Sequence, residues 1–286
     1  MELPESLAWL RATAEGEAWI DRLPQTLAAC VARWRLELGE PFPDSYVSLV
    51  LPARRIDGST AVLKIQFPDR ESDTEADALQ LWDGNGAILL LEKDPEYHAL
   101  LLECCHPGRH LSTAGPDTGL EVLIGLLPRL WVHAHAPFTT LGDEVTHWVA
   151  SLPGEWEAAG EPFEESLLDE VVAMLKGLAS TQGEQVLLHQ DLHGDNVLSA
   201  QREPWLVIDP KPLIGEREFG LSPIIRSAEL GHSREHMLYR LDRLTGDLGL
   251  DRDRARLWAA GHAVAWGFED GKVLPGHIET ARWLLA

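Results

Sequence analysis

The chain of 286 residues is 45% hydrophobic and 24% charged, as is usual for a globular protein, and its formal net charge is −22 at pH 7. Because contacts to nucleic-acid phosphates need Lys and Arg, this acidic balance argues against nucleic acid as a partner. No apolar run approaches the ~20 residues of a membrane span, so we expect no membrane partner either.

The N-terminal region lacks the basic segment and apolar core of a signal peptide. The chain has three cysteines, an odd number that fits a reducing compartment, and we expect a cytoplasmic protein. Residues 5–36 carry apolar and aromatic side chains at helical spacing, which predicts two helices separated at Pro24.

A β-rich section follows. β-prone runs predict strands over 46–51 and 60–65, and Asp57-Gly58 between them is a turn signal. An acidic, helix-compatible segment over 69–81 and a tight turn at 84–86 come next, followed by predicted strands over 87–91 and 97–102.

Lys64 lies near the end of the second predicted strand. Side chains alternate along a strand, so Lys64 should face away from Leu63 and Ile65. The strand alone favours a solvent-facing lysine, although a lysine at such a position can also reach nucleotide phosphates.

The character of the chain changes at Pro107-Gly108, which ends the β-rich section. We therefore predict an N-terminal lobe over 1–105 and a larger, mainly helical lobe over 106–286. Helical spacing recurs over 119–131, 141–152 and 164–178, with breaks at Gly115-Pro116 and Pro153-Gly154, and again over 227–245, 252–270 and 277–285.

The most informative stretch is 186–198. Val186-Leu187-Leu188 is a short apolar run suited to a buried strand, and a group of polar residues follows it: His189, Asp191, His193, Asp195 and Asn196. A second apolar run over 205–208 ends in Asp209. Asp191, Asn196 and Asp209 are thus expected at the ends of short strands.

The spacing His-x-Asp-x-x-x-x-Asn, followed by a strand that ends in Asp, matches the template of phosphoryl transfer in protein kinases. In that template a carboxylate accepts the proton of the attacking hydroxyl, which would be the catalytic role of Asp191. An amide oxygen and a second carboxylate hold Mg²⁺, which would make Asn196 and Asp209 metal ligands.

Two other interpretations compete. His189 and His193 are four residues apart and could form a zinc pair on a helix, but a zincin motif has Glu directly after the first His, where this chain has Gln190. In the second interpretation, these polar residues form only a hydrogen-bonded turn and have no catalytic role.

The run His189-Gln-Asp-Leu-His-Gly-Asp-Asn196 resembles the motif of the aminoglycoside phosphotransferase superfamily. Val207-Ile-Asp-Pro-Lys-Pro212 is similar to the streptomycin 6-kinase and hydroxyurea-resistance kinase branch. The resemblance implies an α+β, bilobal protein-kinase-like fold and an ATP- and Mg²⁺-dependent transfer of phosphate to a small-molecule hydroxyl.

The resemblance also implies nucleotide-binding roles. Lys64 would bind phosphates and Glu75 would orient it. In an alternative alignment with the family pattern, Glu71 would take the place of Glu75. The Glu103 carbonyl and the Cys105 amide would contact the adenine edge.

The chain departs from the family pattern at two places, Gln190 and Gly220, and its loop 52–59 departs from the protein-kinase pattern, as the superfamily often does. Gln190 occupies a position that is usually Gly, and a backbone with positive φ there would be strained. Gly220 stands where an Asp that supports the catalytic segment is expected. The loop 52–59 has one glycine in place of a Gly-rich phosphate loop, and no Walker-type motif occurs.

The acceptor is not specified by the sequence. An aminoglycoside or hydroxyurea follows from the resemblance, a sugar or amino alcohol is the alternative, and a silent kinase-like binding protein is a third hypothesis. The acidic charge would suit a cationic substrate but equally serves solubility. For a polycationic acceptor we expect acidic contacts, with Glu216, Glu269 and Asp270 as candidates. The oligomeric state is left open.

Overall fold

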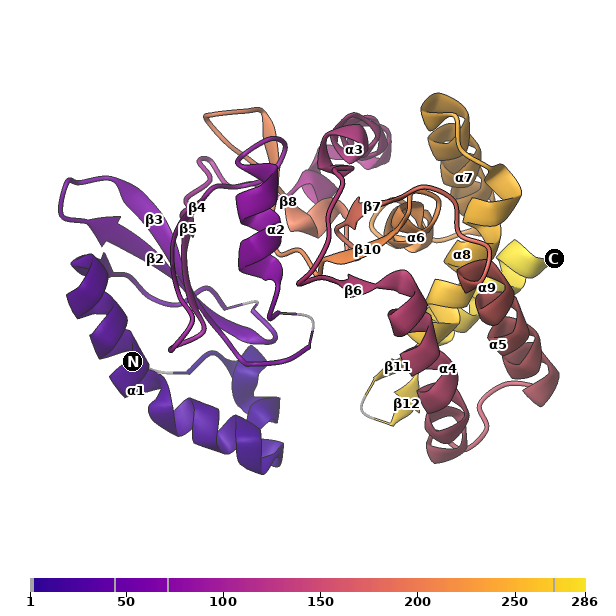
Figure 1. The fold of residues 1–286 in the computed structure, drawn as a ribbon, viewed down its shortest axis with the longest axis horizontal. Helices are drawn as coiled ribbons and strands as arrows, with labels where there is room; N and C mark the ends of the chain where they lie inside the picture. Colours follow the sequence, from indigo (N-terminus) through magenta and orange to yellow (C-terminus); the bar gives the residue numbers. More distant parts are fainter. Residues whose placement is uncertain (1–2, 44, 71, 270) are drawn as a thin grey trace. The chain divides into compact units, whose positions relative to one another are not determined.

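The computed structural model describes residues 3–43, 45–70, 72–269 and 271–286, and its chain divides into two compact units (Figure 1). The first unit comprises Met1–Gly108 together with Ala200–Leu206, and the second comprises Arg109–Ser199 and Val207–Ala286. The chain thus changes unit after residue 108, close to the predicted division after residue 105. The placement of 200–206 in the first unit was not predicted.

Within the described residues, the first unit is built on a five-stranded sheet in which each strand is antiparallel to its neighbours. Its order is β1 (Leu36–Leu38), β2 (Ser48–Arg55), β3 (Thr60–Gln66), β5 (Ala99–Glu103) and β4 (Leu90–Asp94). The predicted turn joins β2 to β3, where Gly58 has φ 84° and donates its N–H to the Arg55 carbonyl (2.9 Å).

Two helices lie on opposite sides of this sheet (Figure 1). The short 3-10 helix η1 (Glu5–Ala12) and α1 (Ala14–Trp34) share an apolar core with the face that carries Leu63 and Ile65. The side chain of Lys64 points to the other face, as strand alternation requires, and meets α2 (Glu75–Trp82) there.

Pro24 does not separate two helices, contrary to the sequence prediction, because α1 runs through it. A proline inside a helix removes one backbone hydrogen bond and costs about 3 kcal/mol. Apolar side chains on both sides of Pro24, including Ile20, Leu23 and Leu27, are buried against the sheet. Burying three such side chains stabilises by roughly 1.5–3 kcal/mol each, which is enough to offset the loss.

The second unit is mainly helical. Its helices are α3 (Pro116–Leu130), α4 (Leu141–Ala158), α5 (Glu165–Ala179), α6 (Ser222–Arg226), α7 (Arg234–Leu248), α8 (Arg252–Ala265) and α9 (Pro275–Leu285), with short 3-10 turns η2 (Leu111–Ala114), η3 (Gly194–Asn196) and η4 (Phe219–Leu221). Its core joins α4, α5 and α8 around buried residues such as Trp148, Val171 and Trp258.

Several helix boundaries differ from prediction: α2 begins at Glu75, later than the predicted 69, and α8 ends at Ala265, before the predicted 270, with strand β11 (Phe268–Glu269) beyond it. The expected break at Pro153-Gly154 is absent, because α4 continues to Ala158 and buries Leu152 and Trp156 on both sides of the proline. Residues 227–233 were predicted as helix, whereas α7 begins at Arg234, where the Ser233 hydroxyl accepts a hydrogen bond from the His236 N–H (3.2 Å) and caps the helix.

Short strands complete the second unit. β10 (Leu213–Glu216) pairs with β6 (Thr139–Thr140) in parallel and with β7 (Gln185–Leu188) antiparallel. β11 (Phe268–Glu269) pairs with β12 (Lys272–Val273), and β8 (Val197–Ser199) follows residues 189–196. β9 (Trp205–Val207) spans the point at which the chain passes from the first unit back to the second.

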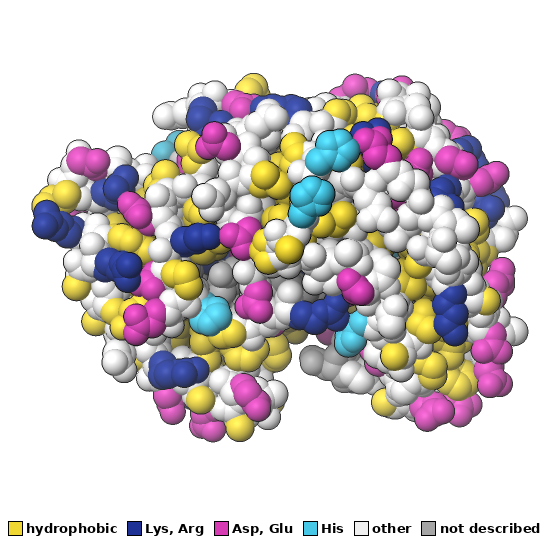
Figure 2. Space-filling view, in the orientation of Figure 1, with side chains coloured by type: hydrophobic (Ala, Val, Ile, Leu, Met, Phe, Trp, Pro, Cys, Tyr) yellow, Lys and Arg dark blue, Asp and Glu magenta, His cyan; other side chains and the backbone are white. Residues whose placement is uncertain are grey.

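Over the described part of the chain, every helix is too short or too polar to cross a bilayer. Figure 2 shows Asp and Glu side chains spread over the visible face with Lys and Arg among them.

Candidate active site

The polar stretch leaves the sheet directly after β7, whose Val186, Leu187 and Leu188 are buried as predicted. We call residues 189–196 the catalytic segment. β7 is fixed by its antiparallel register with β10, in which Leu188 lies opposite Leu213. An apolar strand therefore anchors the polar side chains that follow it.

Asp191 lies at the centre of this segment. The Asn196 side-chain amide donates hydrogen bonds to the Asp191 carbonyl (2.8 Å) and to its carboxylate (3.3 Å). Three basic groups surround the same carboxylate: Lys211 Nζ at 3.5 Å, Arg226 Nη2 at 3.7 Å and His193 Nε2 at 3.9 Å. The carboxylate is oriented and can accept a proton, while positive charge beside it can balance an approaching phosphoryl group.

His189 holds the segment from inside. Its Nε2 lies 2.9 Å from the Ile208 carbonyl, and its Nδ1 accepts the Asp191 N–H at 3.3 Å. Burial lowers the pKa of His189 to about 4, so the ring is neutral at pH 7. Since both ring nitrogens are engaged and the segment is not an α-helix, a zinc pair of His189 and His193 is excluded.

The backbone at Gln190 has φ 65°, the left-handed conformation that a family glycine would accept without strain. Gln190 is only 5% exposed. Asp209 also has a positive φ, 55°. Both unusual conformations occur beside the residues assigned to chemistry, which is where strained backbone tends to concentrate.

Glu229 was not predicted, because nothing in its local sequence marks it. Its carboxylate accepts the Gly194 N–H (2.8 Å) and lies 3.3 Å from His193 Nδ1. Burial acts to raise the pKa of Glu229, but hydrogen bonds from His193 and Ser227 outweigh it and lower the pKa to about 2. Burial also opposes protonation of His193, yet Glu229 and Asp191 together raise its pKa. Glu229 therefore fixes the middle of the catalytic segment.

An Asp at position 220 would crowd the side chain of Leu188. Gly220 is buried, and a Cβ there would lie 3.0 Å from Leu188 Cδ2. The space is filled by an apolar side chain, while His189, Asn196 and Glu229 hold the catalytic segment instead.

Asn196 and Asp209 are suited to a hard cation. The Asn196 amide nitrogen is used on Asp191, which leaves its side-chain oxygen for a ligand. The Ile208 N–H donates to the Asn196 carbonyl (2.9 Å) and so brings the residue before Asp209 alongside Asn196. An amide oxygen and a carboxylate are donors that Mg²⁺ accepts.

Lys64 and Glu75 form the predicted ion pair. Lys64 Nζ lies 2.6 Å from Glu75 Oε2, and the residues are 6% and 1% exposed. The Gln66 side-chain amide donates to the same carboxylate oxygen at 2.7 Å. This geometry supports the register with Glu75; the alternative, Glu71, lies outside the described residues.

The side chain of Glu103 has a structural partner. Arg202 donates to both carboxylate oxygens of Glu103 (2.9 and 2.8 Å) and to the carbonyls of Gly84 and Ala87. This explains why residues 200–206 belong to the first unit. Cys105 is half-buried, and burial raises the pKa of its thiol to about 12, so the thiol is neutral.

Glu216, one of the acidic residues expected around the acceptor, has partners inside the protein. Glu216 is 1% exposed and accepts hydrogen bonds from Arg254, Trp258 and the Gly183 N–H, so it is a buried structural carboxylate, not a substrate contact. Glu269 is exposed at the end of β11, and Asp270 lies outside the described residues.

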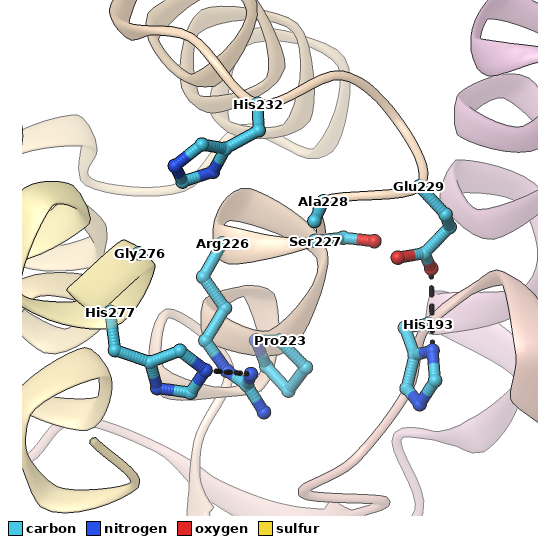
Figure 3. A pocket seen from close by; sticks show the side chains of 9 residues that line it. All are labelled: His193, Pro223, Arg226, Ser227, Ala228, Glu229, His232, Gly276 and His277. Atoms are coloured by element: carbon cyan, nitrogen blue, oxygen red, sulfur yellow. Dashed lines mark hydrogen bonds and ion pairs between the residues drawn. The ribbon is translucent and has the colours of Figure 1, made fainter. Parts of the chain in front are cut away.

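A pocket of about 240 Å³ opens in the second unit instead (Figure 3). His193 and Arg226, both within 4 Å of Asp191, belong to its lining. The complete lining is His193, Pro223, Arg226, Ser227, Ala228, Glu229, His232, Gly276 and His277. A small molecule in this pocket would lie beside the predicted base.

Comparison with known proteins shows the family of the chain. The family model of the aminoglycoside/hydroxyurea antibiotic resistance kinases matches residues 33–271. A hydroxyurea phosphotransferase from Kitasatospora aureofaciens is 41% identical over 282 residues, covering 94% of this chain and 80% of that protein. A streptomycin 6-kinase from Streptomyces glaucescens is 38% identical over 285 residues, covering 95% and 92%.

Solved structures show the same fold at low identity. The choline kinase LicA from Streptococcus pneumoniae matches with a TM-score of 0.65 at 12% identity, covering 92% of this chain and 99% of that chain. A thermostable mutant of aminoglycoside phosphotransferase APH(4)-Ia, solved with AMP-PNP and hygromycin B, matches with a TM-score of 0.61 at 13% identity, covering 92% and 95%. The predicted kinase-like fold is confirmed.

Proposed function

The chain belongs to the aminoglycoside/hydroxyurea antibiotic resistance kinase family, and we propose that it transfers the γ-phosphoryl group of ATP to the hydroxyl of a small molecule in a Mg²⁺-dependent reaction. The observation that carries this proposal is the Asp191 carboxylate, oriented by Asn196 and flanked by Lys211 and Arg226.

Each residue has a separate role. Asp191 accepts the proton of the acceptor hydroxyl, and the side-chain oxygens of Asn196 and Asp209 hold Mg²⁺, which neutralises charge on the phosphates. Lys64, held by Glu75, binds phosphate oxygens. The backbone of Glu103 and Cys105 contacts the adenine edge. Such catalysis works by positioning and charge stabilisation, with no covalent enzyme intermediate.

The test is Mg²⁺-dependent ADP release by purified protein with hydroxyurea, streptomycin, a sugar and an amino alcohol as acceptors. We expect acceptor-dependent turnover that falls at least ~100-fold in Asp191→Asn, because a general base contributes about that much or more. Asp253→Asn, which removes an exposed carboxylate of α8, is the matched control and should keep wild-type turnover. Equal turnover by wild type and Asp191→Asn would exclude Asp191 as the base.

A further inference from the structure

The C-terminal end of α8 carries two rings on one side of the helix. His262 and Trp266 are four positions apart, a spacing that places side chains on the same helix face. The Trp266 N–H donates to the His262 carbonyl at 2.9 Å, so the helical turn is intact here. The ring centroids lie 4.7 Å apart with an interplanar angle of 30°. The two rings therefore form one aromatic surface.

Two cations beside Asp191 lie over this surface. Lys211 Nζ lies 4.7 Å from the centroid of the Trp266 ring and 3.5 Å from the Asp191 carboxylate. The Arg226 guanidinium lies 5.2 Å from the same centroid, and its Nη2 lies 3.7 Å from Asp191. The quadrupole of an aromatic ring attracts a cation over its face. One indole ring therefore contacts two cations whose like charges repel each other.

Neither cation makes a tight ion pair with Asp191. Charge-assisted hydrogen bonds from nitrogen to a carboxylate oxygen measure about 2.7–2.9 Å. The distances here are 3.5 Å for Lys211 and 3.7 Å for Arg226. At these distances the cations are close enough to stabilise charge on a phosphoryl group, and the carboxylate keeps its capacity to accept a proton.

Arg226 is also held by two histidines that carry no charge. Its Nε donates to His262 Nδ1 at 3.2 Å. Its Nη1 lies 3.3 Å from His277 Nε2, the contact drawn in Figure 3, and His277 Nδ1 lies 3.2 Å from the Ala263 carbonyl. Burial lowers the pKa of His277 to about 4 and that of His262 well below 6.5, so both rings are neutral at pH 7. Neutral acceptors fix the guanidinium without cancelling its charge.

His262 makes one side-chain hydrogen bond over the described part of the chain, the one with Arg226. Its side chain is completely buried, and its ring packs edge-on against Trp148 and Phe219, with centroids 5.9 and 5.4 Å away. Its Nε2 is buried among the described residues without a hydrogen-bond partner. A polar group in such apolar surroundings costs free energy, which an apolar side chain would avoid. The contact with Arg226 is thus what a histidine contributes here.

We propose that Trp266 and His262 are positioning residues for phosphoryl transfer. Trp266 holds Lys211 and Arg226 beside Asp191, and His262 fixes the orientation of Arg226, so that both positive charges meet the transferring phosphoryl group. The inference rests on the proposed function. Because both residues act through the cations that they hold, their loss should lower kcat more than it weakens the binding of Mg-ATP or of the acceptor.

Trp266→Leu removes the ring that contacts both cations. We expect kcat to fall roughly 10- to 100-fold, because a misplacement of about 1 Å at a reacting centre can cost 100-fold. The KM for Mg-ATP should stay within about threefold. Trp266→Phe keeps an aromatic face and should recover kcat to within about fivefold of wild type. Steady-state kinetics with hydroxyurea or streptomycin, whichever the wild type phosphorylates, measures both variants.

Trp131→Leu is the matched control. Trp131 is also partly buried in the second unit, and the Arg217 guanidinium lies 5.6 Å from its ring centroid. That arginine pairs with Glu184 at 3.0 Å. We expect kcat of this variant within about twofold of wild type. Equal losses of kcat in Trp131→Leu and Trp266→Leu would make the effect one of packing alone and overturn the positioning role of Trp266.

His262→Leu separates positioning from packing. Leucine suits the aromatic surroundings, so a purely structural role predicts a protein that is as stable and as active as wild type. The positioning role predicts unchanged or higher stability in urea with kcat roughly 5- to 10-fold lower, because Arg226 loses a hydrogen-bond acceptor. His262→Asn, whose Oδ1 can replace Nδ1 as the acceptor, should recover part of the loss. Wild-type kcat in His262→Leu would overturn the role of His262.

A double variant tests whether Trp266 acts through Arg226. Residues that act through one another give non-additive losses. Trp266→Leu should therefore lower kcat at least about threefold less in an Arg226→Gln background than in the wild type. The same loss in both backgrounds would show that Trp266 acts independently of Arg226.

The two proposals fail in different ways. Unchanged kcat in Trp266→Leu and in His262→Leu, with turnover that still depends on Asp191, would overturn the positioning role and keep the kinase function. Failure of the folded wild-type protein to transfer phosphate from Mg-ATP to any acceptor tested would overturn the proposed function and the inference with it.

Discussion

At the scale of single residues, Lys64 and Glu75 show how a buried charge depends on a close opposite charge. Two charges removed from water are costly, and the pair is favourable only because its atoms lie 2.6 Å apart and Gln66 adds a hydrogen bond. Asp77, on the same helix as Glu75, forms a partly exposed pair with Lys93 of β4 at 2.9 Å, and water screens this pair. Loss of the buried pair should therefore lower the free energy of unfolding more than loss of the exposed pair.

Glu75→Gln removes the negative charge that lies 2.6 Å from Lys64 Nζ in a buried site. We expect a loss of about 3 kcal/mol in the free energy of unfolding and at least ~10-fold lower kcat/KM for ATP, because the lysine is no longer oriented. Asp77→Asn should change stability by less than about 1 kcal/mol and leave the ATP kinetics unaltered. Urea denaturation and steady-state kinetics measure both; equal effects of the two substitutions would contradict the assignment of Lys64.

Gln190 is a residue at which the chain is not optimised for stability. A non-glycine residue at positive φ costs about 1–2 kcal/mol, and the buried Gln190 amide nitrogen finds no hydrogen-bond partner in the part of the chain that the structure describes. Glycine would remove both the backbone strain and the unpaired amide. The greater entropy of a glycine in the unfolded chain would lower the stability by roughly 0.5–1 kcal/mol.

We therefore expect Gln190→Gly to raise the free energy of unfolding by about 1 kcal/mol. The control is Glu161→Gly, which has a similar φ of 56° but an exposed side chain, so it should give a smaller gain. The urea midpoints of the two variants and the wild type measure these gains. A midpoint below wild type for Gln190→Gly would show that packing of the Gln190 side chain contributes more than the strain costs.

At the scale of elements, one buried carboxylate joins the three-stranded sheet of β6, β10 and β7 to α8 by hydrogen bonds. Glu216 on β10 accepts from Arg254 Nε (2.6 Å) and from Trp258, both on α8, and from the Gly183 N–H (2.9 Å). Because β10 also pairs with β7, this contact holds the strand from which the catalytic segment departs.

Glu216→Gln should lower the free energy of unfolding by about 3 kcal/mol, since Arg254 then loses its buried counter-charge. The KM for the acceptor should stay within about twofold, because Glu216 does not reach the pocket. Glu269→Gln, at an exposed site, should change stability by less than about 0.5 kcal/mol. Thermal or urea unfolding and acceptor kinetics measure these effects. A raised acceptor KM with unchanged stability would contradict the structural role of Glu216.

At the scale of the whole molecule, stability should depend on pH through buried histidines. Burial lowers the pKa of His189 and His277 from 6.5 to about 4, and it lowers that of His262 well below 6.5. The unfolded chain therefore binds more protons than the folded chain between about pH 4 and 6.5. His193 acts in the opposite sense: its raised pKa gives stability that is present below pH 6.5 and lost as pH rises through its folded pKa.

We expect the free energy of unfolding to fall on acidification from pH 6.5 toward pH 4, by up to about 1.4 kcal/mol per pH unit for each neutral buried histidine. Glu229, whose pKa is lowered to about 2, adds a further loss below pH 4.5. Urea unfolding at a series of pH values measures the slope. His262→Gln removes one titrating group and should make the slope shallower; an unchanged slope would rule out His262 as a contributor.

The sequence by itself predicted the chemistry and determined much of the layout. Asp191, Asn196 and Asp209 were predicted because their spacing along short apolar strands is local, and a short segment fixes it. Lys64 and Glu75 were predicted from strand alternation and family pattern, and the structure brings them together. The strands, the Asp57-Gly58 turn and most helices follow from periodicity, which is also a local property.

Only the tertiary structure decided the surroundings of these residues. Pro24 and Pro153 lie inside helices because buried side chains on both sides outweigh a local helix-breaking preference. Glu216 is a buried structural carboxylate. Arg226 and Glu229 contact the catalytic segment although they lie more than 30 positions away in the sequence, and Trp266 packs against Arg226. No local pattern encodes such contacts, because they arise when separate elements pack and bring charges within a few ångströms of one another.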